Sequence, residues 1–248
     1  MREQQNILNI KFDVVDEKKA LDKLVRFLNE DSSMKEVYTP NPEIVMLAQE
    51  DGELFKILNN ADLVLADGIG LIIASKLKGL RLKHRVTGVD TMDKLLQYCE
   101  KNQKSFFMFG GKPGIAELAC RNIKAKYKNI KVAGCHHGYF DTKDETRIIN
   151  KINNAKPDIL FVCLGAPKQE KWINRNKDKL NCKLAMGVGG SVDVYAGVAK
   201  RAPVIFRKLG LEWFYRLLKE PWRFKRMLVL PKFLVKFVFT KNDNQTAV

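Results

Sequence analysis

An aspartate at the end of a short apolar run, Asp67, is the residue of this sequence best suited to acid–base chemistry. It follows residues 62–66 and precedes Gly68 and Gly70, which give the chain conformational freedom at that point. A carboxylate at a strand end can face a crevice and accept a proton from a substrate hydroxyl. The same carboxylate can also serve as the N-cap of a helix that begins near Ile69. The sequence leaves both interpretations open.

A second candidate is the pair Gly110 and Gly111, which follows the apolar run 105–109. Pro113 fits the first position of a predicted helix, because its missing N–H costs nothing there. Backbone N–H groups that converge at a helix start can approach a phosphate or a ribose. The signal is weak by itself, since the chain contains neither the dinucleotide-binding nor the P-loop glycine pattern.

Arg85, the three histidines and the spacing of the aspartates bear on whether the protein binds a diphosphate or a metal ion. Arg85 lies in the short run 81–87, where it can pair with a diphosphate or remain an ordinary surface charge. The three histidines are too few and too badly spaced for a zinc site. No two aspartates stand two positions apart, so the Asp-x-Asp clamp for a metal-bound diphosphate is absent. We therefore expect no metal ion and no cofactor, and protein groups must stabilise any leaving diphosphate.

The elements that must position these residues alternate along the chain. From residue 6 to about 195, short β-rich runs alternate with amphipathic segments, which predicts an α/β, Rossmann-like, mostly parallel sheet with helices on both faces. Ligands of such sheets bind beyond the carboxyl ends of the strands, so the residues just after each run are the first candidates. The predicted strands are residues 7–12, 36–38, 62–66, 105–109, 131–135, 158–164 and 183–188. The predicted helices are residues 16–29, 43–58, 89–101, 113–127, 143–154 and 168–176, and another begins near 69.

The chain of 248 residues, 46% of them hydrophobic, is long enough to bury one substantial core. Its five cysteines are odd in number and form no Cys-x-x-Cys pair, which indicates reduced thiols in a cytoplasmic protein. The first residues do not resemble a secretory signal, and no window reaches the ~20 apolar residues of a spanning helix. We expect a protein that is soluble or lies on a membrane surface.

The character of the sequence changes after residue 195. Residues 196–248 hold a net charge of +9, more than half of the chain's +16, with nine aromatic residues and three prolines. We predict a Rossmann-like core at 1–195 and a basic appendage of short helices at 196–248. Basic residues interleaved with aromatic rings suit an anionic membrane surface. Nucleic-acid binding and plain packing on the core are alternatives that composition leaves open.

Taken together, the loops resemble those of the WecG/TagA/CpsF family of glycosyltransferases. The resemblance runs from about residue 10 to 240 in the expected order, and several ordered motifs are more specific than any one of them. The motifs are Thr39-Pro40-Asn41-Pro42-Glu43, Ala66-Asp67-Gly68-Ile69-Gly70, Arg85-Val86-Thr87-Gly88-Val89-Asp90, Phe109-Gly110-Gly111, Leu164-Gly165-Ala166-Pro167-Lys168-Gln169-Glu170, Gly187-Val188-Gly189-Gly190-Ser191-Val192-Asp193, Gly197 and Arg201-Ala202-Pro203.

The resemblance implies an inverting bacterial enzyme that transfers N-acetylmannosamine from UDP-ManNAc to the 4-hydroxyl of GlcNAc-diphospho-undecaprenol, in wall teichoic acid linkage-unit synthesis. Asp67 is the implied general base, and Arg85, Gln169 and Thr39 are the other implied catalytic residues. The implied substrate-binding residues are Asn41, Gly110, Gly111, Gly165, Pro167, Glu170, Arg216, Arg223 and Arg226. The resemblance places these three arginines near the diphosphate, although Pro221 interrupts the helix that would align them. It also implies that the appendage docks on the membrane and helps to close the site.

Motifs of this kind fix a family better than a sugar, so another donor, UDP-ManNAcA or UDP-glucose, is an alternative. The runner-up from another class is a basic nucleotide- or nucleic-acid-binding module without catalysis. The leading interpretation predicts a cytoplasmic protein at the inner face of the cell membrane, with UDP-ManNAc, the lipid acceptor and anionic lipid as partners and no nucleic acid. The oligomeric state is left open, a homo-oligomer included.

Overall fold

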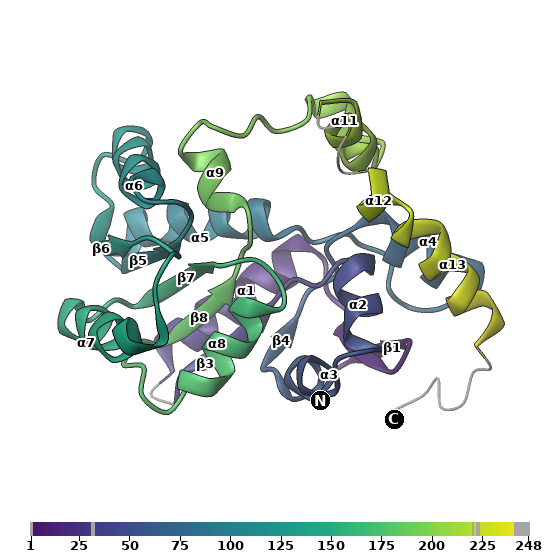
Figure 1. Ribbon diagram of the computed structural model, residues 1–248, viewed down its shortest axis with the longest axis horizontal. Coiled ribbons are helices and arrows are strands. Elements are labelled where there is room, and N and C mark those ends of the chain that lie inside the picture. Colours follow the sequence, from purple (N-terminus) through teal and green to yellow (C-terminus); the bar gives the residue numbers. More distant parts are fainter. Residues whose placement is uncertain (1, 31–32, 220, 222–223, 241–248) are drawn as a thin grey trace.

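The computed structural model describes residues 2–30, 33–219, 221 and 224–240. Its centre is a six-stranded sheet in the order β4-β3-β8-β7-β5-β6, in which all paired neighbours run parallel (Figure 1). The strands are β3 (Lys35–Tyr38), β4 (Leu63–Val64), β5 (Ser105–Gly110), β6 (Lys131–His136), β7 (Ile159–Cys163) and β8 (Leu184–Gly187). The predicted α/β, Rossmann-like fold is confirmed.

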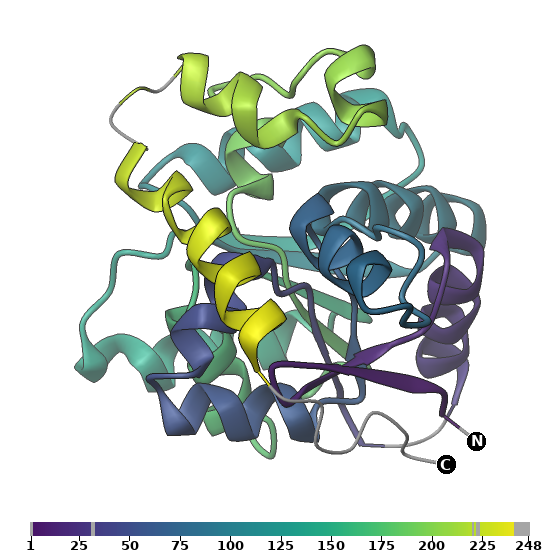
Figure 2. The same cartoon turned by 90° about the vertical axis from the view of Figure 1, so that its right-hand side faces the viewer.

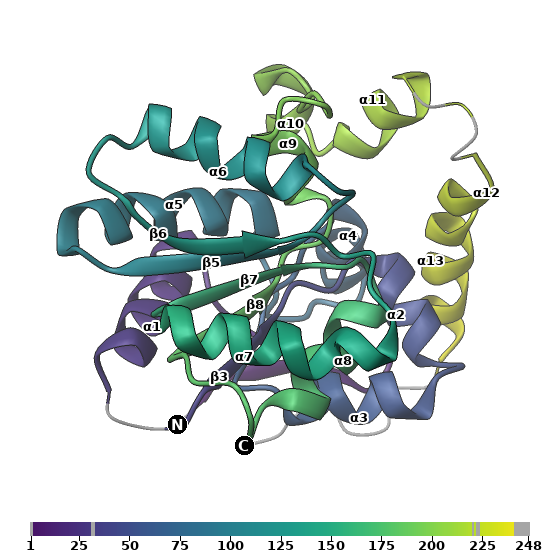
Figure 3. The same cartoon turned by 60° about the vertical axis from the view of Figure 1, so that its left-hand side comes forward.

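Helices cover both faces of this sheet, and each face has its own apolar core (Figure 3). Alternate residues of a strand point to opposite faces, so Phe106 and Met108 join one core while Phe107 and Phe109 join the other. All four side chains are fully buried, as expected for an apolar run in a strand covered on both sides. One face carries α1 (Glu17–Asn29), α5 (Gly88–Asn102) and α6 (Ile115–Lys126). The other carries α2 (Pro42–Ala48), α3 (Gly52–Asn60), α4 (Ile69–Leu77), α7 (Glu145–Ala155) and α8 (Lys168–Asn176).

The first predicted strand, residues 7–12, is wrong, because the chain forms a hairpin there. β1 (Gln4–Ile7) and β2 (Ile10–Asp13) pair antiparallel as a separate two-stranded sheet. Leu8 and Asn9 join them with φ angles of 48° and 61°, a left-handed turn without any glycine. The apolar side chains on both sides of the turn nevertheless belong to the core.

Two predicted helices differ from the structure at their ends. Residues 43–58, expected as one helix, form α2 and α3, because the side chain of Asp51 accepts backbone hydrogen bonds and starts a new helix. The helix expected from Pro113 begins as α6 at Ile115, with Gly114 as its N-cap. The other predicted strands and helices are confirmed, with small differences at their ends.

After the last strand, the chain continues into short helices, as expected for the appendage. The first is α9 (Ser191–Tyr195), which falls within the predicted core. Those of the appendage are α10 (Val204–Lys208), α11 (Glu212–Lys219), α12 (Phe224–Met227) and α13 (Val229–Phe239). Helix α13 packs on α2 and α4 along one side of the molecule (Figures 1 and 2), and its Phe233 and Phe237 are buried. The last helix therefore belongs to the packed body of the protein, while the division of the chain at residue 195 stays a prediction. Within the part of the chain described above, no helix is both long and apolar enough to cross a membrane.

Candidate active site

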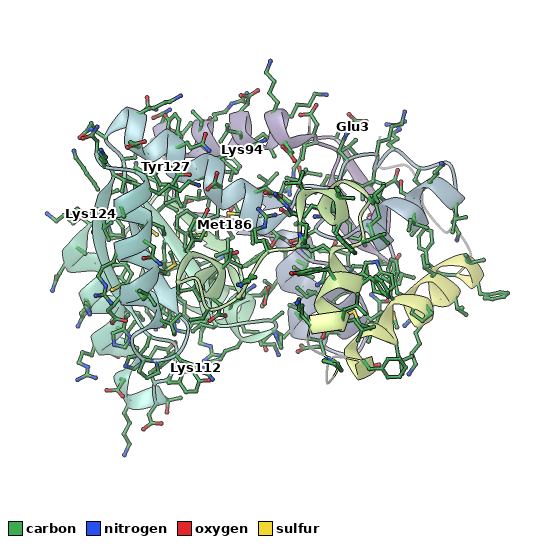
Figure 4. All side chains as sticks on the ribbon, turned by 90° about the horizontal axis from the view of Figure 1, so that it is seen from above. Glu3, Lys94, Lys112, Lys124, Tyr127 and Met186 are labelled. Carbon is green, nitrogen blue, oxygen red and sulfur yellow. The ribbon has the colours of Figure 1, made fainter. Side chains whose placement is uncertain are left out.

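The predicted site residues that follow the strands lie at one edge of the sheet, because all six strands run in the same direction. The loops after β3, β4, β5, β7 and β8 all leave the sheet from this carboxyl edge. In the view from above, Lys112 lies in the loop after β5, and Met186 of β8 lies among the packed side chains of the core (Figure 4). The edge brings together residues that are far apart in the chain, since Thr39 is bonded to Gly187, the last residue of β8, 148 positions later.

Asp67 follows β4, and its side chain is bonded to the start of α5. The Gly88 N–H donates to Asp67 Oδ2 at 3.0 Å, and the Asp67 N–H donates to the carbonyl of Pro40 at 3.2 Å. Gly68 occupies the N-cap position of α4, so Asp67 is not the cap of that helix. The Asp67 side chain is partly exposed. A partly exposed carboxylate that a backbone N–H orients is suited to accept a proton from a bound hydroxyl.

Thr39 and Asn41 lie in the loop after β3, next to the Asp67 loop. Thr39 Oγ1 donates to the carbonyl of Gly187 at 3.3 Å and lies close against Gly88, where an added Cβ would be 2.9 Å away. Asn41 is the N-cap of α2, because its Oδ1 accepts a backbone N–H of the first turn at 3.0 Å. The Asn41 oxygen is therefore used within the fold, while Thr39 and Asp67 meet at Gly88.

Gln169 and Glu170 are almost fully buried in the first turn of α8. The Gly189 N–H donates to Gln169 Oε1 at 3.0 Å, and Gln169 Nε2 donates to Glu170 Oε1 at 2.9 Å. These bonds brace the loop after β8, a role that no spacing in the sequence indicates. Burial raises the pKa of Glu170, although the hydrogen bond from Gln169 acts to lower it. The Oε2 atom of Glu170 has no hydrogen-bond partner among the described residues. Direct contact of either residue with substrate stays a prediction.

Gly110 and Gly111 lie where β5 meets β7. Gly110 has a φ of 138°, and an added Cβ would be 2.2 Å from the carbonyl oxygen of Cys163. The Gly111 N–H donates to the same oxygen at 3.2 Å. This N–H is therefore bonded to the neighbouring strand and does not lie at the start of a helix. Gly165 has a φ of 76° and leads to the cis peptide bond before Pro167. The predicted contact of these four residues with substrate stays a prediction.

Gly110→Ala should destabilise the protein strongly, since the added methyl group would overlap the Cys163 carbonyl between two central strands. Gly114→Ala is the matched control, because its φ of 83° is also positive but no atom lies within 4 Å of the added Cβ. We expect the control to lose only about 1–2 kcal/mol, the cost of a left-handed residue with a side chain. Urea denaturation compares the two variants. Equal losses would contradict the close backbone approach at Gly110.

Arg85 lies between α4 and α5 and pairs with the appendage. Its Nη2 is 2.9 Å from Glu212 Oε2, and both side chains are largely buried. Arg85 also lines a polar crevice of about 480 Å³, together with Thr87, Asp90 and Arg207. In the structure, Arg85 therefore joins the core to the appendage, and its pairing with a substrate diphosphate stays a prediction.

The three arginines expected near the diphosphate are distributed along the appendage. Arg216 belongs to α11 and Arg226 to α12, with only the backbone of each described. Arg223 lies outside the described residues. Because α11 ends at Lys219 and α12 begins at Phe224, the interruption that Pro221 predicts is confirmed.

An apolar pocket of about 110 Å³ borders Gly68, the residue after Asp67. Trp213, Met227 and Leu230 of the appendage line one part of it, and the first turns of α2 and α4 line the other. Among the residues that the structure describes, no three His, Cys, Asp or Glu side chains form a group able to hold a metal ion. The appendage thus contributes side chains to the neighbourhood of Asp67.

A parallel sheet with polar loops gathered at its carboxyl edge is the architecture of Rossmann-like enzymes that bind a nucleotide there. The chain belongs to the glycosyl transferase WecG/TagA/CpsF family, whose model matches residues 5–247. It is 39% identical over 210 residues to the N-acetylglucosaminyldiphosphoundecaprenol N-acetyl-beta-D-mannosaminyltransferase of Bacillus subtilis (strain 168), covering 85% of this chain and 81% of that protein. It is 38% identical over 221 residues to the Staphylococcus aureus (strain MRSA252) protein of the same name, covering 89% and 86%. The family resemblance of the loops is confirmed over nearly the whole chain.

Proposed function

We propose that this protein is an inverting glycosyltransferase that transfers N-acetylmannosamine from UDP-ManNAc to the 4-hydroxyl of GlcNAc-diphospho-undecaprenol, in wall teichoic acid linkage-unit synthesis. The name shared by the two relatives supports the acceptor and the sugar, and both align over more than four fifths of their length. The observation that carries the chemistry is Asp67, a partly exposed carboxylate that the Gly88 N–H orients at the carboxyl edge of the sheet.

In the proposed reaction, Asp67 accepts the proton of the acceptor 4-hydroxyl as that oxygen attacks C1 of the donor sugar. A bond forms between O4 and C1 while the bond between C1 and the UDP oxygen breaks on the opposite side, which inverts the configuration at C1. Negative charge develops on the departing UDP and requires cationic side chains. We assign this role to Arg85 and to the appendage arginines Arg216, Arg223 and Arg226.

A donor screen with a synthetic GlcNAc-diphospho-lipid acceptor tests the proposal. UDP-ManNAc should release UDP and give a product that is larger by one N-acetylhexosamine, whereas its C2 epimer UDP-GlcNAc is the control donor. A product from UDP-glucose or UDP-ManNAcA, with none from UDP-ManNAc, would refute the assigned donor and leave the family membership unchanged.

The appendage is proposed to hold the enzyme on the anionic inner surface of the cell membrane. Of the fifteen large apolar side chains exposed among the described residues, twelve lie after residue 195, and Phe214, Phe224 and Phe239 are among them. Aromatic rings suit the acyl boundary, and each nearby basic residue adds about 1 kcal/mol of attraction to anionic headgroups. Binding to anionic liposomes that weakens in high salt would support this location. Binding of RNA without UDP release would favour the nucleic-acid alternative.

Turnover should survive treatment with EDTA. The sequence contains no Asp-x-Asp clamp, and the proposed reaction assigns the charge of the leaving UDP to arginines. Initial rates with UDP-ManNAc, measured before and after EDTA and again with added Mg²⁺ or Mn²⁺, check this expectation. A rate that falls in EDTA and returns with either ion would place a metal ion in the reaction.

A further inference from the structure

Two residues of the recognised motifs, Arg201 and Asp90, have no role in the reaction described above. Arg201 lies between α9 and α10, and Asp90 lies in the first turn of α5, 111 positions earlier in the chain. Arg201 Nη1 donates to Asp90 Oδ1 at 2.7 Å, and Arg201 Nη2 donates to Asp90 Oδ2 at 3.1 Å. Two parallel bonds between a guanidinium and a carboxylate fix orientation as well as distance.

Asp90 is also bonded to the cap of its own helix. Thr87, the N-cap of α5, donates through Oγ1 to Asp90 Oδ2 at 2.6 Å and accepts the Asp90 N–H at 3.1 Å. The next residue is Gly88, whose N–H donates to Asp67 Oδ2 at 3.0 Å. A continuous series of hydrogen bonds and one covalent step therefore leads from Arg201 to the carboxylate of Asp67.

The Arg201–Asp90 pair is partly shielded from water, with side chains 21% and 31% exposed. Burial opposes both charges, yet the bonds from Arg201 and Thr87 keep the pKa of Asp90 below its usual value, and Asp90 keeps that of Arg201 above its usual value. A second cation, Arg207, has its Nη1 4.0 Å from Asp90 Oδ1. Both members of the pair are therefore charged at neutral pH, and the removal of either one leaves the other charge without its main partner.

We propose that Arg201 and Asp90 are positioning residues, which hold the first turn of α5 so that the Gly88 N–H aims the Asp67 carboxylate at the acceptor hydroxyl. The inference rests on the proposed role of Asp67 as the base. Displacing a reacting group by about 1 Å can lower a rate by about 100-fold. A small shift of the Asp67 carboxylate is therefore enough to lower turnover. Because Arg201 belongs to the appendage and Asp90 to the core, the same pair links the appendage to the base.

Arg201→Ala and Asp90→Asn test the proposal in the full chain, with kcat and KM measured for UDP-ManNAc and a water-soluble GlcNAc-diphosphate analogue. We expect kcat to fall about tenfold or more while KM for the donor stays within about twofold, since only the orientation of the base changes. Arg201→Lys, which keeps the charge but donates from a single nitrogen, should recover part of the loss.

Lys126→Met is the matched control. Lys126 Nζ pairs at 2.7 Å with Asp93, which lies on α5 like Asp90 but one turn further from Asp67. This variant should keep its kcat even where it lowers the temperature of unfolding. An unchanged kcat in Arg201→Ala, or an equal loss of kcat in Lys126→Met, would overturn the positioning role.

A double-mutant cycle separates action through Asp67 from general loosening of the fold. If Arg201 acts through Asp67, Arg201→Ala should lower the residual rate of Asp67→Asn by less than about twofold, whereas independent effects would multiply. A further tenfold loss in the double variant would overturn the proposal. Near-normal turnover in Asp67→Asn alone would refute the proposed base, and with it the positioning role. Loss of turnover in Asp67→Asn with a normal Arg201→Ala would refute the positioning role alone.

Discussion

Asp67→Asn is expected to lower turnover about 100-fold or more, while the fold and the binding of the donor are kept. The amide is nearly the same size as the carboxylate, and its oxygen can still accept the Gly88 N–H, so the loop geometry should survive. The variant loses the carboxylate to which the proposed reaction assigns the proton of the attacking hydroxyl. Product formation with the synthetic lipid acceptor measures the loss, and calorimetric binding of UDP checks the donor site.

Asp62 provides a matched control at the opposite end of the same strand. The Glu36 N–H donates to Asp62 Oδ2 at 2.9 Å, so this residue is also a carboxylate that accepts a backbone N–H, but it precedes β4 and lies at the amino edge of the sheet. Asp62→Asn should therefore keep near-normal turnover. If Asp67→Asn were equally active, Asp67 would be a structural residue at the start of α5.

Phe233→Ala should lower the free energy of unfolding by about 3–5 kcal/mol, the usual cost of removing a fully buried phenylalanine ring. Phe233 is 0% exposed and belongs to the core that α2 and α4 share with the sheet. Its ring stacks on Phe237 with the ring centroids 6.2 Å apart. The loss of the ring leaves a cavity between α13 and the core, and urea denaturation of the full chain measures its cost.

Phe239 is the control for this prediction, since it lies at the end of the same helix and is 81% exposed. Phe239→Ala should change the free energy of unfolding little, because an exposed ring loses few contacts. Equal and small losses in the two variants would show that α13 is not an integral part of the fold. The expected difference means that the residues after 195 include a helix on which the core depends.

The parallel sheet could be predicted because its strands are short apolar runs that end in glycine or polar loops, as residues 105–110 and 159–165 do. The hairpin of β1 and β2 could not, because Leu8 and Asn9 adopt positive φ angles without glycine. The break between α2 and α3 could not be predicted either, for a different reason. Apolar residues continue at helical spacing across it, and only the side chain of Asp51 starts the second helix.

The loops of the candidate site could be predicted because the carboxyl edge follows from the direction of the strands. The ion pairs that support the site could not. Arg85 and Glu212 are 127 positions apart, and Arg201 and Asp90 are 111 apart, whereas spacing in a sequence indicates neighbours only within one element. The bracing role of Gln169 was hidden in the same way, since its partner Gly189 follows a different strand.

The part of the appendage that carries Arg216 and Arg226 is attached to the core at both ends. Glu212 pairs with Arg85 before it, and Phe233 is buried after it. A segment attached to the core at both ends cannot diffuse away from it. Its side chains therefore keep an effective concentration on the order of millimolar near the core. In the proposed reaction, whose acceptor would arrive by lateral diffusion in a bilayer, this double attachment would keep the arginines near the site before either substrate binds.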